Sequence, residues 1–256
     1  MGAVATAACA LALWATLAWA AAAAPVTAGA AEASANWGGY AAVAPAGSPP
    51  VTFTSASGSW RQAATDCAGV AGTGAASAVW VGLGGYQLDS NALEQVGTGA
   101  ECSDSGVASY YAWYELVPGP LVKLPMAIAP GDLVTASVTV SRGTVSLQLR
   151  NRTRKTVVVR RLPAGSVDLS SAEWIAEAPQ SCVGSSCTTL PLANFGTVTF
   201  STISAVGNAT AGSLTHPLWD AVPLMLVPRS GPGTSAPTAL AADGRSFSVS
   251  WVGEAT

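Results

Sequence analysis

Apolar and polar residues alternate along several short segments of this chain. In residues 134–140 every even position is Val or Ala, and Thr or Ser stands between most of them. Residues 145–149 and 247–251 repeat the same period of two. Since successive side chains of a strand point to opposite faces, these segments predict strands with one face on a core. The continuous apolar run Val157–Val159 predicts a strand buried on both faces.

Turn residues separate these runs, for example Pro130-Gly131 and Asn151-Arg152. After the first thirty residues no segment keeps a helical period over three turns, and strands do not alternate with helices. The pattern predicts an all-β fold, an antiparallel β-sandwich of jelly-roll or concanavalin-like type with two packed curved sheets. Residues 31–50 are expected to form an exposed N-terminal stretch. Residues 246–252 are expected to form a last strand that rejoins the sheet, so that 31–256 is a single domain.

The first thirty residues have the character of a signal peptide. Residues 11–24 are an apolar, Ala-rich run, and small residues suited to cleavage follow at 22–24 and 28–30. The usual basic residues before the run are missing, because the first Lys or Arg is Arg61. A retained membrane anchor is the alternative. We expect residues 1–30 to be removed and the protein to be secreted.

Charge and cysteine content narrow the class of protein. Only 10% of residues are charged and the formal net charge is -3, so the clustered basic residues that bind nucleic acid are lacking. Four cysteines remain beyond the signal segment, which in an exported chain predicts two disulfides. Three pairings exist, and we favour the local ones, Cys67–Cys102 and Cys182–Cys187. A zinc site is the competing interpretation, but the Cys-x4-Cys spacing without a second pair suits it poorly.

Common catalytic arrangements are excluded by composition. His216 is the one histidine, and it precedes Pro217 in an expected loop without a Gly-x-Ser-x-Gly motif. We therefore expect no metal, no cofactor and no Ser-His triad. The Gly-rich segment 82–85 lacks the following Gly-Lys-Ser/Thr of a phosphate-binding loop and is expected to be a turn.

The carboxylates are few, and three of them lie beside aromatic residues. In a strand, Glu173 and Glu177 share one face while Trp174, between them, points to the other. Glu115 ends the aromatic segment 110–114, in which Tyr111 and Trp113 share its face. Acids and aromatics together on one sheet face suit a polymer-binding cleft, and burial there would raise carboxyl pKa values. A solvated outer sheet face is the alternative.

These residues lie in segments that resemble the glutamic peptidases, or eqolisins, of peptidase family G1. The matching segments occur in the family's order and cover most of residues 36–200: Asn36-Trp37-Gly38-Gly39-Tyr40, Gly58-Ser59-Trp60, Val79-Trp80-Val81-Gly82, Leu93-Glu94-Gln95-Val96-Gly97, Ala112-Trp113-Tyr114-Glu115, Ala172–Glu177 and Asn194–Phe200.

The resemblance implies a β-sandwich endopeptidase, active in acid, with a Gln/Glu dyad. The catalytic glutamine falls on Gln95 and the catalytic glutamate on Glu177, since Cys182 matches a family disulfide position; Glu173 is the alternative glutamate. Trp80, Trp113, Glu115 and Glu173 are expected to line the cleft. The sequence departs from the family at Gly84, where an acid is usual, and at Leu116, where an aromatic is usual.

In the implied mechanism, Glu177 accepts a proton from the attacking water and Gln95 donates hydrogen bonds to the oxyanion. The expected substrates are unfolded proteins or peptides, cleaved by a secreted monomer. Two other classes remain open. A jelly-roll glycoside hydrolase could use Glu173 and Glu177, whose spacing matches the outer acids of Glu-x-Asp-x-Glu, and a carbohydrate- or peptide-binding module would need no catalytic group.

Overall fold

The computed structural model describes residues 1–2, 30–183, 186–229 and 233–253. Its elements, nearly all strands, are β1 (Glu32–Ser34), β2 (Trp37–Val43), β3 (Phe53–Arg61), the 3-10 turn η1 (Ala68–Val70), β4 (Ala76–Leu83), β5 (Leu93–Cys102), β6 (Ala108–Val117), β7 (Val122–Leu124), β8 (Leu133–Ser141), β9 (Thr144–Asn151), β10 (Thr156–Pro163), β11 (Ser171–Glu177), β12 (Gln180–Val183), β13 (Ser186–Thr189), β14 (Thr197–Gly207), β15 (Thr210–Gly212), β16 (Asp220–Leu226), β17 (Thr234–Pro237) and β18 (Phe247–Gly253). The residues of the expected signal peptide from 3 to 29 lie outside the described part.

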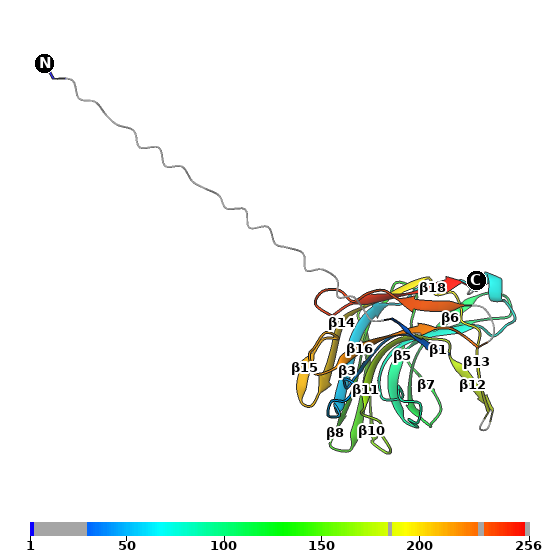
Figure 1. Ribbon diagram of the computed structural model, residues 1–256. Coiled ribbons are helices and arrows are strands. Elements are labelled where there is room, and N and C mark those ends of the chain that lie inside the picture. Colours follow the sequence, from blue (N-terminus) through cyan, green and yellow to red (C-terminus); the bar gives the residue numbers. More distant parts are fainter. Residues whose placement is uncertain (3–29, 184–185, 230–232, 254–256) are drawn as a thin grey trace.

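The strands form one continuous sheet that curls into two layers. The first layer has the order β10-β9-β8-β3-β14, and the second continues with β18-β17-β16-β2-β11-β4-β5-β6-β7. Neighbours along this path are antiparallel; β1 adds to β16 in parallel, and β12 and β13 form a separate hairpin. In Figure 1 strands such as β3, β8 and β11 follow strongly bent paths, and the β12–β13 hairpin extends at the side of the layers. The predicted all-β sandwich is confirmed.

Strand β14 joins the two layers. Its first residues pair with β18, and its later residues pair with β3 after a register shift between Ser201 and Ser204. Thr202 within the shift has a left-handed φ of 53°. Such a bulge bends a strand and increases its twist, which allows one strand to serve both layers.

The core fills the space between the layers with large aromatic and aliphatic side chains. Trp60 of β3 and Trp174 of β11 are 1% and 0% exposed. Each indole N–H donates across the layers: Trp60 to the Thr98 hydroxyl at 3.0 Å, and Trp174 to the Ser57 carbonyl at 2.9 Å. Because a buried N–H without a partner costs free energy, these bonds fix how the layers face each other.

Most expectations from the hydrophobic pattern are confirmed. Residues 134–140, 145–149 and 247–251 lie in β8, β9 and β18, and their buried positions alternate as predicted. Both expected disulfides are present, Cys67–Cys102 and Cys182–Cys187.

Two expectations are wrong. The run Val157–Val159 lies in β10, which ends the sheet, so one of its backbone edges has no neighbour among the described strands, and Val157 is 48% exposed. Residues 31–50 are exposed only at their ends, 31–33 and 46–50, because β2 lies between β16 and β11 and is almost wholly buried. The backbones of β2 and β11 approach closely at Gly39, where a Cβ would lie 2.1 Å from the Trp174 carbonyl oxygen.

Candidate functional site

The second layer carries a second group of aromatic and acidic side chains on the face turned away from the core. We call this the outer face; it belongs to β2, β11, β4, β5 and β6, and its apolar cluster includes Trp80, Trp113 and Ile175. Strand pairing arranges it in three cross-strand rows: Glu173–Gly82–Gln95–Glu115, then Ile175–Trp80–Gly97–Trp113, then Glu177–Ala78–Gly99–Tyr111. All six sequence-predicted site residues therefore lie on one face, built from strands far apart in the chain.

Glu177 ends β11 and is held by polar groups of two other segments. Asn36 Nδ2 donates to one carboxyl oxygen at 2.9 Å, and Trp80 Nε1 donates to the other at 2.7 Å. Trp80 itself packs edge-on against Trp37, with ring centroids 5.1 Å apart. Burial raises the pKa of Glu177 to about 7, opposed by the Trp80 hydrogen bond and assisted by the negative charge of Glu115. A half-buried carboxyl that titrates near neutrality is suited to proton transfer.

Gln95 is buried in β5 and hydrogen-bonded to its neighbour across the strand pair. Its Nε2 donates to Glu115 Oε2 at 2.8 Å. Burial raises the pKa of Glu115, and the Gln95 amide partly offsets that effect. Among the described residues the Gln95 Oε1 atom has no hydrogen-bond partner. Glu115 thus connects the two residues: it accepts from Gln95, and its charge acts on Glu177.

Three of the remaining expected cleft residues are almost wholly buried. Trp80 and Trp113 are 0% and 2% exposed and form the apolar floor between the first and third rows. Glu173 is 0% exposed, and within the described residues neither carboxyl oxygen has a hydrogen-bond partner. Burial raises the pKa of Glu173 well above its ordinary value.

A carboxylate that the sequence did not reveal lies beside Gly84. Asp168, in the loop before β11, accepts from the Gly85 N–H at 3.1 Å and the Ser170 N–H at 2.9 Å, and from the Ser90 hydroxyl. A Cβ on Gly84 would meet the Asp168 Cβ at 2.6 Å. An acid is therefore present at this loop although position 84 is glycine. It is separated from Gly84 by more than eighty residues of sequence, and no local motif points to it.

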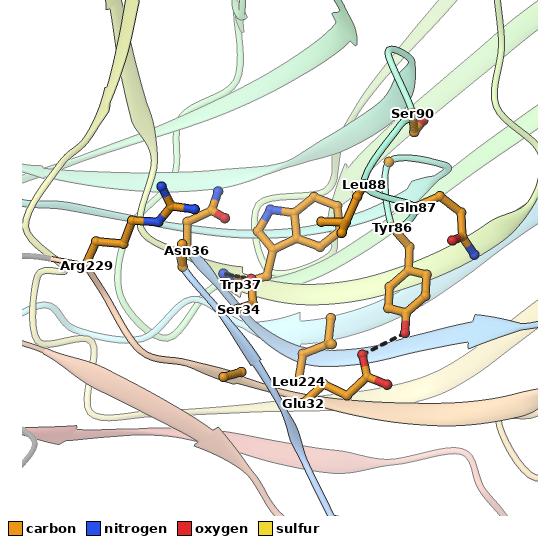
Figure 2. Close-up of a pocket in the computed structure, with 13 residues that line it drawn as sticks. Glu32, Ser34, Asn36, Trp37, Tyr86, Gln87, Leu88, Ser90, Leu224 and Arg229 are labelled. Carbon is orange, nitrogen blue, oxygen red and sulfur yellow. Dashed lines mark hydrogen bonds between the residues drawn. The ribbon is translucent and has the colours of Figure 1, made fainter.

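A groove of about 690 Å³ adjoins the outer face. It lies between the segment 32–37 and the loop 85–90, and Figure 2 shows the Trp37 indole within it. At one end Tyr86 donates to Glu32 at 2.8 Å, and at the other lie Asn36 and Arg229. Asn36 lines the groove and donates a hydrogen bond to Glu177, so this end of the groove lies beside the third row.

Other sequence features lie away from this site. His216 stacks on Trp219 in the turn between β15 and β16, with ring centroids 4.4 Å apart. In the described ranges no three His, Cys, Asp or Glu side chains gather as a metal site would require. A search of the same residues for a helix with the length and apolar character of a membrane span found none.

Comparison with known proteins identifies the family. The model of the Peptidase A4 family matches residues 35–220. This chain belongs to the Peptidase A4 family. The match covers well over half of the chain and contains all six site residues expected from the sequence, so the resemblance to glutamic peptidases is confirmed.

Individual members of the family support the assignment. Aspergillopepsin-2 of Aspergillus niger is 31% identical over 143 residues, which are 53% of this chain and 48% of that protein, so the chain spans about half the length of this relative. Scytalido-glutamic peptidase, solved with a transition state analog inhibitor, superposes with a TM-score of 0.68 at 25% identity, over 85% of this chain and 98% of that one. Aspergilloglutamic peptidase from Aspergillus niger shares the fold, with a TM-score of 0.58 at 24% identity over 70% and 99% of the two chains.

Proposed function

We propose that this family member is a secreted endopeptidase that cleaves unfolded protein chains with Glu177 and Gln95. Glu177 as carboxylate takes a proton from the attacking water and returns it to the leaving amine. Gln95 donates hydrogen bonds to the oxyanion of the tetrahedral intermediate. The observation that carries the proposal is the outer face itself, which presents a carboxyl of pKa about 7 and a buried amide on either side of Trp80.

Glu177 is the better candidate of the two acids on β11. It is half-buried, and its hydrogen bonds from Asn36 and Trp80 hold the carboxyl in one orientation. Glu173 is fully buried, which removes it from water and substrate. The same burial argues against a glycoside hydrolase, since that chemistry needs a second accessible acid close to Glu177.

Glu115 orients the amide of Gln95. A glutamine side chain has two amide hydrogens, and Glu115 accepts one of them at 2.8 Å. The other hydrogen remains available to a substrate oxygen. Glutamine suits this position because it stays uncharged at every pH, whereas a carboxylate would repel the oxyanion.

The groove beside Trp37 is proposed to hold an extended part of the substrate. It opens next to Asn36, so a peptide bound there would pass directly to Glu177. The disulfides suit an extracellular, oxidising environment. We expect the substrates to be unfolded chains, and the enzyme to act as a monomer without a cofactor.

The test is cleavage of an acid-unfolded protein between pH 3 and pH 8, a range that spans the Glu177 pKa of about 7, in the presence of serine- and metalloprotease inhibitors. Wild type should produce fragments, while Gln95→Ala and Glu177→Gln should each lower kcat by roughly a hundredfold or more. Glu173→Gln is the matched control, because it makes the same change four positions earlier on the same face and should keep activity within about threefold. Full activity of Glu177→Gln, or hydrolysis of a β-glucan that is insensitive to Gln95→Ala, would contradict the proposal.

A further inference from the structure

The positive charge of this chain is concentrated in strands β8, β9 and β10 and in the turns that join them. Residues 133–167 contain seven of the eleven Lys and Arg residues and no Asp or Glu. The seven are Arg142, Arg150, Arg152, Arg154, Lys155, Arg160 and Arg161. The low overall charge suggests that basic residues are not clustered, yet a formal net charge of -3 conceals a segment of charge +7.

Strand pairing distributes these seven residues along the β9–β10 hairpin, which ends the first layer. One group lies at the turn between the two strands, within residues 150–155. The other lies near the start of β9: Arg142 is in the turn before it, and Arg160 and Arg161 are in β10 opposite its first half. We call the seven residues the basic stripe. Because β9 has eight residues, at about 3.3 Å per residue the stripe is roughly 25 Å long.

Most charges of the basic stripe are not neutralised within the protein. Arg154 is the exception, since its Nε lies 2.6 Å from Asp132 Oδ2. Among the described residues the other six make no ion pair, and all of them except Arg160 are exposed. Neighbouring positive charges without partners raise the local potential, which attracts anions.

Protection of the sheet edge does not account for the whole stripe. Charged side chains on an edge strand discourage pairing with other chains, and β10 is such a strand. Arg150, however, lies on β9, which has β8 and β10 as neighbours on its two edges. Arg142 and Arg152 lie in turns. These three charges guard no edge, and recognition of an anion explains them together with those on β10.

The composition of the stripe suits a linear anion without aromatic groups. Six of its seven residues are Arg, whose planar guanidinium donates two parallel hydrogen bonds to a phosphate or sulfate group. Residues 133–167 contain no Phe, Trp, Tyr or His, so nucleic-acid bases would find no ring to stack on. The turns at the two ends, 142–143 and 152–155, contain no apolar residue that could enter a lipid layer.

We propose that the basic stripe binds a linear polymer of phosphate or sulfate groups along β9 and β10. The stripe belongs to the first layer, whereas the outer face belongs to β2, β11, β4, β5 and β6 of the second. The protein can therefore stay attached to a matrix that carries such a polymer while the outer face acts on other chains. This binding does not depend on the proposed peptidase function.

The test is binding of fluorescently labelled polyphosphate and dextran sulfate, followed by anisotropy. Wild type should bind both at about 50 mM salt, and the affinity should fall steeply toward about 200 mM. The triple variant Arg150→Gln, Arg152→Gln, Arg161→Gln should raise Kd at least about tenfold and reduce the slope of log Kd against log salt by about 2. These three side chains are exposed, so the urea midpoint of the variant should match that of wild type.

A second triple variant removes the same charge elsewhere and is the matched control. It combines Lys123→Gln, Arg229→Gln and Arg245→Gln, all at exposed positions outside the stripe. Its Kd for polyphosphate should stay within about threefold of wild type. Equal weakening in the two triple variants would overturn the proposal, because net charge alone would then explain the binding.

Three other results would also overturn the proposal. They are no binding of wild type at about 50 mM salt, tighter binding of single-stranded DNA than of polyphosphate of equal charge, and tighter binding of phosphatidylglycerol vesicles than of either polymer. The outcome is separate from that of the peptidase function. If folded wild type binds polyphosphate but cleaves no peptide, only the proposed function fails, and if it cleaves peptide without binding either polymer, only this inference fails.

Discussion

Replacement of Glu94 by Gln should change how the stability of this protein depends on pH. Glu94 lies in β5 next to the proposed Gln95 but on the opposite face, in register with Leu83 and Leu116. It is 1% exposed, and among the described residues its Oε2 atom has no hydrogen-bond partner. Burial, with the nearby charge of Asp168, raises the pKa of Glu94 from 4.5 to about 8.

Proton linkage determines the sign and size of the effect of Glu94 on the free energy of unfolding. Between pH 4.5 and pH 8 the folded protein binds a proton at Glu94 that the unfolded chain has released. The free energy of unfolding therefore falls by about 1.4 kcal/mol per pH unit over this range, an upper limit of about 5 kcal/mol. Water entering around the charged carboxylate reduces the loss, and we expect roughly 2–4 kcal/mol from Glu94. The stabilisation is complete below the unfolded pKa and is lost as the pH rises through the folded one.

Urea denaturation followed by tryptophan fluorescence at pH 4.5, 6 and 7.5 measures this dependence. Wild type should lose stability steeply with rising pH, because the pKa values of Glu173 and Glu177 are raised as well. Glu94→Gln should lose about 2–4 kcal/mol less over the same range. Asp104→Asn, at an exposed turn, should leave the wild-type slope unchanged. A Glu94→Gln slope equal to that of wild type would refute the reasoning.

Three further predictions concern other parts of the structure. The acid limb of kcat/KM should titrate near pH 7 if Glu177 must be ionised, and a limb below pH 5 would exclude it as the base. Asp132→Asn should cost about 2–3 kcal/mol near neutral pH, since Arg154 and buried amides lower the pKa of Asp132; the cost should shrink as pH falls toward 2, and a constant cost would contradict the charge argument. Replacing Cys67 and Cys102 together by Ser should lower the free energy of unfolding by about 4 kcal/mol for a loop of 35 residues, and a loss under 1 kcal/mol would show that the bond constrains little.

The pattern of residues predicts the strands best where one face meets the core and the other meets water. The segments 134–140 and 247–251 satisfy this condition, so their alternation is clear. The prediction fails at β2, because this strand has neighbours on both edges and is buried on both faces. It also fails at Val157, because there an apolar run occurs on an edge strand. Strand order decides these cases, and local sequence does not contain it.

The site was predictable where residue types within one segment suffice. Glu173 and Glu177 on one face, with Trp174 on the other, follow from the period of a strand. The burial of Glu173 and the position of Asp168 at Gly84 depend on packing between distant segments, and no local motif indicates either. The strand period predicts the face on which Tyr111 lies, but the position of its ring over β5 depends on the absence of a side chain at Gly99.

At the small residues of the outer face, strand propensity and packing favour different side chains. Gly97 and Gly99 are poor strand formers, and a β-branched residue there would ordinarily raise strand propensity by up to about 1 kcal/mol. At Gly97 even a Cβ would lie 2.2 Å from the Val79 carbonyl oxygen, and at Gly99 it would collide with Tyr111. A variant library selected for heat resistance should therefore retain glycine at 97, and it should admit larger residues at 99 only together with a smaller side chain at 111.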